Sequence, residues 1–139
     1  MKKPSQMQKS ILNNKVNISF FIIAFLCLTL FVGAENISFE KTLWLHDDGG
    51  DSAAPQMSWF FFKNDVWRFP IGSNPNYGLE LASSIVFADS IPILTLIFKI
   101  FRSLLPENFQ YISLWYFLCF YLQLFFSFKI LNKFSSSNL

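Results

Sequence analysis

The chain has 139 residues, of which 53% are hydrophobic and only 14% are charged. A soluble domain has about 25% charged residues, so this composition argues against a soluble protein. The net charge is only +2, and the basic residues lie mostly at the ends of apolar segments, which argues against nucleic-acid binding. Cys27 and Cys119 both fall inside apolar segments, so we expect them to form neither a disulfide nor a metal site.

The N-terminal part of the chain combines a basic segment with an apolar one. Residues 1–15 are polar and carry four lysines and no acid, and residues 16–34 form an apolar run. As a helix this run is about 28 Å long, close to the hydrocarbon thickness of about 30 Å. The lysines predict a cytoplasmic N-terminus. A signal peptide cleaved before Glu35 fits the same residues, and either interpretation exports the segment that follows.

Residues 35–80 are predicted to form an acidic extracytoplasmic loop. Turn-forming residues are dense at 47–51 and again at 70–78. Between these two clusters, residues 57–69 alternate aromatic side chains with charged or polar ones. This pattern is typical of a short amphipathic helix that lies along a membrane surface.

Two further apolar segments follow the loop. Residues 81–101 are predicted to be a second transmembrane helix, which Asp89, Ser90 and Pro92 interrupt, and residues 109–131 a third. The positive-inside rule is strained by this topology, because Lys129 and Lys133 would lie outside. The fold class is therefore an all-α integral membrane protein of about three transmembrane helices, in the cytoplasmic (inner) membrane. Its expected segments are a cytoplasmic N-terminus (1–15), helix 1 (16–34), the loop (35–80), helix 2 (81–101), a cytoplasmic turn (102–108), helix 3 (109–131) and a polar tail (132–139).

Two groups of acids are candidates for chemistry. Asp89 lies inside the second apolar segment, where an ionisable residue is costly and suggests a function. Alternatively, the helix begins near Ile91, with Asp89 as a cap and Pro92 in the first turn. The second group is the acidic turn at residues 47–51, preceded by His46, which could bind a divalent cation or supply a general base. A solvated loop with capping acids explains the same turn.

Several short motifs together resemble a known type of protein. They are Gly50-Asp51, Trp67-Arg68-Phe69-Pro70-Ile71-Gly72, Tyr77-Gly78, Ser83-Ser84-Ile85 and Asp89-Ser90-Ile91-Pro92. These residues look like the N-terminal part of an uncharacterised family of large bacterial multi-spanning membrane proteins. The layout is similar to that of the GT-C membrane glycosyltransferases, in which an acid of the first external loop serves as base or metal partner. Such proteins have many more than three spans, so the resemblance implies a fragment of a larger polytopic fold.

The resemblance implies roles for particular residues. Asp51 and Asp89 are the candidate catalytic residues, and Arg68 and Asp48 are the candidate substrate-binding residues. The implied activity is sugar transfer from a lipid-phosphate donor, with a divalent cation as the candidate cofactor. The implied partners are the lipid bilayer, a lipid-linked sugar and further transmembrane helices of a longer chain or subunit. The alternative is a non-catalytic small membrane subunit, or a truncated remnant with no activity of its own.

Overall fold

The computed structural model describes residues 6–41, 53–78, 83–88 and 90–137. These residues form a mostly helical protein with two compact units. Unit 1 contains the two ends of the chain, up to residue 37 and from residue 113, and unit 2 is formed by Ser38–Ile112.

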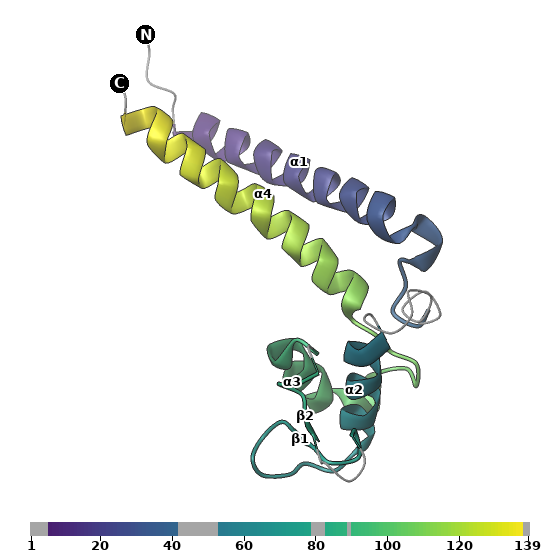
Figure 1. The fold of residues 1–139 in the computed structure, drawn as a ribbon. Helices are drawn as coiled ribbons and strands as arrows, with labels where there is room; N and C mark the ends of the chain where they lie inside the picture. Colours follow the sequence, from purple (N-terminus) through teal and green to yellow (C-terminus); the bar gives the residue numbers. More distant parts are fainter. Residues whose placement is uncertain (1–5, 42–52, 79–82, 89, 138–139) are drawn as a thin grey trace. The chain divides into compact units, whose positions relative to one another are not determined.

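Unit 1 is built from the two longest helices, α1 (Gln6–Val32) and α4 (Ile112–Ser137). The start of α1 and the end of α4 lie at the same end of this helix pair (Figure 1). Edge-to-face contacts join Phe20 to Phe128 and Phe21 to Phe117, with ring centroids 5.3 Å and 5.0 Å apart. Gly33 ends α1 with a φ of 84°, a conformation that glycine adopts without strain, and a short 3-10 helix, η1 (Ala34–Asn36), follows.

The two long helices are apolar on nearly all sides. Candidate membrane spans cover Asn14–Val32, with 19 residues, and Ile112–Ser135, with 24 residues. Buried side chains in α1 follow one stripe at every fourth position, namely Ala24, Leu28 and Val32. Many large apolar side chains of both helices are exposed, which is typical of helices that meet a medium other than water. Both helices are long and apolar enough to cross a membrane, near the first and third spans expected from the sequence.

The second expected span differs from the structure. Among the described residues of this segment, only Pro92–Ile100 forms an α-helix (α3), and Ser83–Ser84 forms strand β2 instead. Nine residues of helix rise about 13 Å, less than half of a bilayer's hydrocarbon core. The prediction of a helix over 81–101 was therefore wrong, because α3 is a short helix of unit 2. The alternative of a helix that begins near Ile91, with Pro92 in its first turn, is correct, although the N-cap residue is Ile91 and not Asp89.

Unit 2 is organised around α2 (Ala53–Asn64), α3, the 3-10 helix η4 (Arg102–Leu104) and the antiparallel pair of β1 (Ser73–Asn74) with β2 (Figure 1). The prediction of a helix within 57–69 was correct in kind, but α2 begins at Ala53, ends at Asn64 and packs one side into unit 2. Trp59 and Phe62 of α2 are buried, and Trp59 Nε1 donates a hydrogen bond to the Phe109 carbonyl at 2.7 Å. Trp59, Phe109, Tyr111 and Ile112 form the core, with Phe98 of α3 stacked on Tyr111.

Hydrogen bonds of Gln110 connect the first and last residues of unit 2. Its backbone amide donates to the Phe39 carbonyl at 2.7 Å, and its side-chain amide donates to the Ser38 carbonyl. Its side-chain oxygen accepts a hydrogen bond from the Ile112 amide at 2.7 Å. The rings of Phe39 and Phe109 are stacked beside these bonds. Segments far apart in the sequence therefore meet where the chain enters and leaves unit 2.

Candidate functional site

Basic side chains gather where α2 and α3 end. We call this group the basic cluster, and it consists of Lys63, Asp65, Arg68, Lys99 and Arg102. All five residues belong to unit 2. The group combines four cations with one carboxylate, so the partners of each side chain decide what the cluster can do.

Lys99 is the most buried cation of the cluster, with 1% of its surface exposed. Its ammonium lies 3.6 Å from the centroid of the Phe62 ring and 4.8 Å from that of Trp67. It also donates to the Val66 carbonyl at 3.4 Å. Burial lowers the pKa of Lys99 from 10.5 to about 8, against the opposing attraction of Asp65. Two aromatic faces replace part of the hydration that this amine loses.

The Asp65 carboxylate holds the Arg68 side chain in place. Its carboxylate accepts hydrogen bonds from the Val66 amide at 2.7 Å and from the Arg68 guanidinium at 3.0 Å and 3.1 Å. The hydrogen bond from Arg68 is the main reason why the pKa of Asp65 lies below its ordinary value. The same contact raises the pKa of Arg68. The Asp65 side chain is only 6% exposed while that of Arg68 is 44% exposed, so the pair presents a fixed guanidinium at the surface.

The other two cations bind main-chain carbonyl groups. Arg102 donates to the carbonyls of Lys63 and Asp65, at the C-terminal end of α2. Lys63 donates to the carbonyls of Pro106 and Glu107, and burial lowers its pKa. Cations are favoured at a helix C-terminus, where carbonyls lack partners within the helix. Lys63 and Arg102 therefore join α2 to the segment after α3, and their role is structural.

A second polar group lies inside unit 2. Ser58, Asn74 and Ser90 are fully buried, and Asn74 Nδ2 donates to the Ser58 carbonyl at 2.9 Å. The Ser58 and Ser90 hydroxyls are 3.4 Å apart. Among the described residues, Asn74 Oδ1 finds no hydrogen-bond partner. This group joins α2, β1 and the segment just before α3. Its member Ser90 directly follows Asp89 in the sequence.

The structure tests only part of the predicted site. Asp48, Asp51 and Asp89, together with His46, lie outside the described residues. Arg68 is described and is an exposed cation of the basic cluster, as is Arg102. Within the described part of the chain, no three His, Cys, Asp or Glu residues gather in a way that could hold a metal ion.

Sequence reasoning missed Asp65 and Lys99. In the sequence, Lys99 follows an apolar run, and such a cation is typical of a helix end at a membrane surface. The three-residue spacing of Asp65 and Arg68 was the available signal for their ion pair. The approach of Lys99 to Phe62 and Trp67 depends on tertiary packing and has no local signature.

A family model for a domain of unknown function, DUF6311, matches residues 21–139. The chain therefore belongs to the DUF6311 family. Comparison with curated proteins and with solved structures finds no match.

Proposed function

We propose that this chain is a membrane protein that crosses the bilayer twice, through α1 and α4. The observation that carries this proposal is the exposure of apolar side chains along both candidate spans. Phe31 of α1 is 78% exposed, and Leu131 and Phe134 of α4 are each 67% exposed. Such surfaces are unfavourable in water, with a cost of about 25 cal/mol per Å².

The charge pattern supports one orientation of these two spans. Six of the 11 basic residues lie near the start of α1 or near the end of α4. All nine acids lie between Glu35 and Glu107. The middle of the chain holds the remaining five basic residues. With two crossings, Lys129 and Lys133 come to the same side as the N-terminal lysines, and the positive-inside rule is satisfied. Both termini are then cytoplasmic, and unit 2 is extracytoplasmic.

Within this topology, unit 2 acts as a folded, non-catalytic module that the two spans hold at the membrane. Lys63 and Arg102 are occupied by carbonyl groups, and Lys99 is enclosed by aromatic rings. These contacts support a structural use of the cluster. The uncovered apolar sides of α1 and α4 are suited to lipid or to further transmembrane helices of a partner.

Two measurements on the cellular protein test the membrane proposal. The chain should stay in the membrane fraction after alkaline carbonate extraction. Mass spectrometry of that fraction should find the Met1 end still attached, because α1 serves as a permanent span. A mature N-terminus at Glu35 would establish a cleaved signal peptide and leave one span.

A second candidate function is a GT-C-like glycosyltransferase activity, and the Arg68–Asp65 pair favours it. A carboxylate that fixes an exposed guanidinium prepares it for bidentate binding of a phosphate. Arg68 would then neutralise the phosphate of a lipid-linked sugar, with Asp48 beside the substrate. Asp51 would orient or deprotonate the acceptor hydroxyl, helped by a divalent cation, and Asp89 would be the second catalytic residue.

The catalytic candidate is tested by Asp51→Asn and Asp89→Asn, in the longest natural form of the protein. Losing one general base typically reduces a rate about 10²–10⁴-fold, whereas membrane insertion should not change. Glu40→Gln is the matched control, because Glu40 is an exposed acid of unit 2 with no proposed role. Equal transfer rates in all three variants would eliminate this candidate and leave the non-catalytic module.

A further inference from the structure

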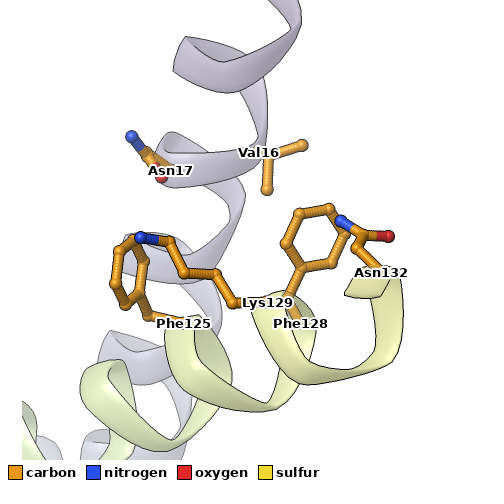
Figure 2. Close-up of a pocket in the computed structure, with 6 residues that line it drawn as sticks. All are labelled: Val16, Asn17, Phe125, Phe128, Lys129 and Asn132. Carbon is orange, nitrogen blue, oxygen red and sulfur yellow. The ribbon is translucent and has the colours of Figure 1, made fainter. Parts of the chain in front are cut away.

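A cavity of about 390 Å³ lies within unit 1, between α1 and α4. Val16 and Asn17 line it from α1, and Phe125, Phe128, Lys129 and Asn132 line it from α4 (Figure 2). It therefore combines two aromatic walls with three polar side chains, two of them amides and one an amine. None of these residues belongs to the basic cluster of unit 2.

The polar side chains of the cavity lie at similar distances from the ends of the candidate spans. Asn17 lies three residues after the start of the span Asn14–Val32. Lys129 and Asn132 lie six and three residues before the end of the span Ile112–Ser135. At 1.5 Å per residue, these positions are about 5 to 9 Å from the span ends. These positions lie in the outer part of a hydrocarbon core of about 30 Å, close to the headgroups.

The electrostatics of this cavity favour an anion. Lys129 brings its ammonium to 4.4 Å from the centroid of the Phe125 ring. Lys15 and Lys133 are close to the cavity residues in the sequence, and all nine acids of the chain lie between Glu35 and Glu107. An ammonium and two side-chain amides are donors suited to phosphate oxygens. The Phe125 and Phe128 rings offer apolar contact to the glycerol and upper acyl carbons of a lipid.

We propose that this cavity binds the phosphate headgroup of an anionic lipid. Lys129 supplies the charge, and the amides of Asn17 and Asn132 donate hydrogen bonds to the phosphate oxygens. The inference rests on the proposed membrane insertion, and with the orientation argued above the lipid belongs to the cytoplasmic leaflet. Basic pockets between transmembrane helices on that side are suited to anionic headgroups.

The test uses the full chain in nanodiscs of phosphatidylcholine with a minor fraction of phosphatidylglycerol. Native mass spectrometry then counts the lipids that each protein retains. The wild-type protein should retain phosphatidylglycerol in preference to phosphatidylcholine. Lys129→Gln should weaken that retention about tenfold, the order expected for one charge-assisted hydrogen bond. Lys129→Arg should keep it, which would show that the loss does not come from misfolding.

Lys133→Gln is the matched control, because Lys133 is one helical turn away on α4 and does not line the cavity. It should leave retention within twofold of the wild type. Equal losses in Lys129→Gln and Lys133→Gln would overturn the proposal in favour of diffuse attraction to a basic helix end. Unchanged retention in Lys129→Gln would overturn it as well.

Two further measurements distinguish a lipid site from a soluble-phosphate site and from a failure of membrane insertion. Soluble glycerol phosphate should not bind the protein in discs of phosphatidylcholine alone, and its binding would assign the cavity to a soluble phosphate. A wild-type protein that resists carbonate extraction but retains both lipids equally would contradict this inference alone. A protein that carbonate releases from the membrane would contradict the proposed membrane insertion itself.

Discussion

The ammonium group of Lys99 lies 3.6 Å from the centroid of the Phe62 ring, inside unit 2. This contact joins α3 to α2, and the Trp67 ring covers the same amine from the loop after α2. A charged amine in such a place loses most of its hydration, and the aromatic faces return only part of that energy. The position of Lys99 therefore makes the stability of unit 2 sensitive to pH.

Lys99→Met should reduce the rise in stability between pH 8 and pH 10. The pKa of Lys99 is about 8 in the folded protein and 10.5 in the unfolded chain. The unfolded chain binds more protons between these values, so the free energy of unfolding increases with pH there. Lys63 also has a lowered pKa, so the slope should shrink without vanishing. Thermal unfolding in detergent, followed by near-ultraviolet circular dichroism, measures it.

The upper limit of this pH window comes from Tyr111. Burial raises its pKa from 10.0 to about 12, so the stability it contributes falls as the pH rises above 10.

Lys41→Met is the control for Lys99→Met, because Lys41 is an exposed lysine outside the basic cluster. Identical slopes for the wild type and Lys99→Met would show that Lys99 is not buried as described.

Gln110→Leu should destabilise unit 2 strongly. The substitution leaves the Ser38 carbonyl and the Ile112 amide without their side-chain partner. Each buried polar group left unsatisfied costs about 1–3 kcal/mol. The melting temperature in detergent should therefore fall by several degrees. Gln123→Leu, at an exposed position of α4, should change it little. Equal melting temperatures for the two variants would argue against the bridge between Ser38 and Ile112.

The sequence predicted the two outer helices because length and continuous apolar character are local properties. The error over residues 81–101 also has a physical reason. A run of apolar residues buries itself equally well in lipid or in a protein core, and hydropathy does not distinguish the two. Pro92 correctly marked the start of a helix, but the nine-residue length of α3 follows from its packing against α2.

The candidate site was less predictable than the fold. The bond from Lys63 to the Pro106 carbonyl joins residues 43 positions apart, and no sequence pattern specifies it. Arg68 was identified through the Trp-Arg-Phe-Pro-Ile-Gly motif, whereas its partner Asp65 belongs to none of the motifs that carry the resemblance. Burial of Asp65 depends on α2 ending at Asn64, so its role became visible only with the tertiary structure.

The loop after α2 should contact the membrane surface in place of the helix expected there. Phe69 is 93% exposed, and Trp67 and Ile71 are also exposed beside the Arg68 guanidinium. Exposed aromatic residues next to a cation are typical of membrane interfaces. A nitroxide at Phe69→Cys, in a Cys27→Ser, Cys119→Ser background, should collide more with oxygen than with a water-soluble nickel complex. The same label at Asn76→Cys, in an exposed turn, should show the opposite preference. Similar collision ratios at both positions would place the loop in water.

Maleimide labelling of single cysteines in intact cells tests the two-span topology most directly. In the background without Cys27 and Cys119, Asn76→Cys should react with an impermeant maleimide. Ser5→Cys and Ser136→Cys should react only after the membrane is opened, because both termini are cytoplasmic in this account. Labelling of Ser136→Cys in intact cells would contradict two crossings and restore an odd number of spans. Protection of Asn76→Cys would reverse the orientation of unit 2.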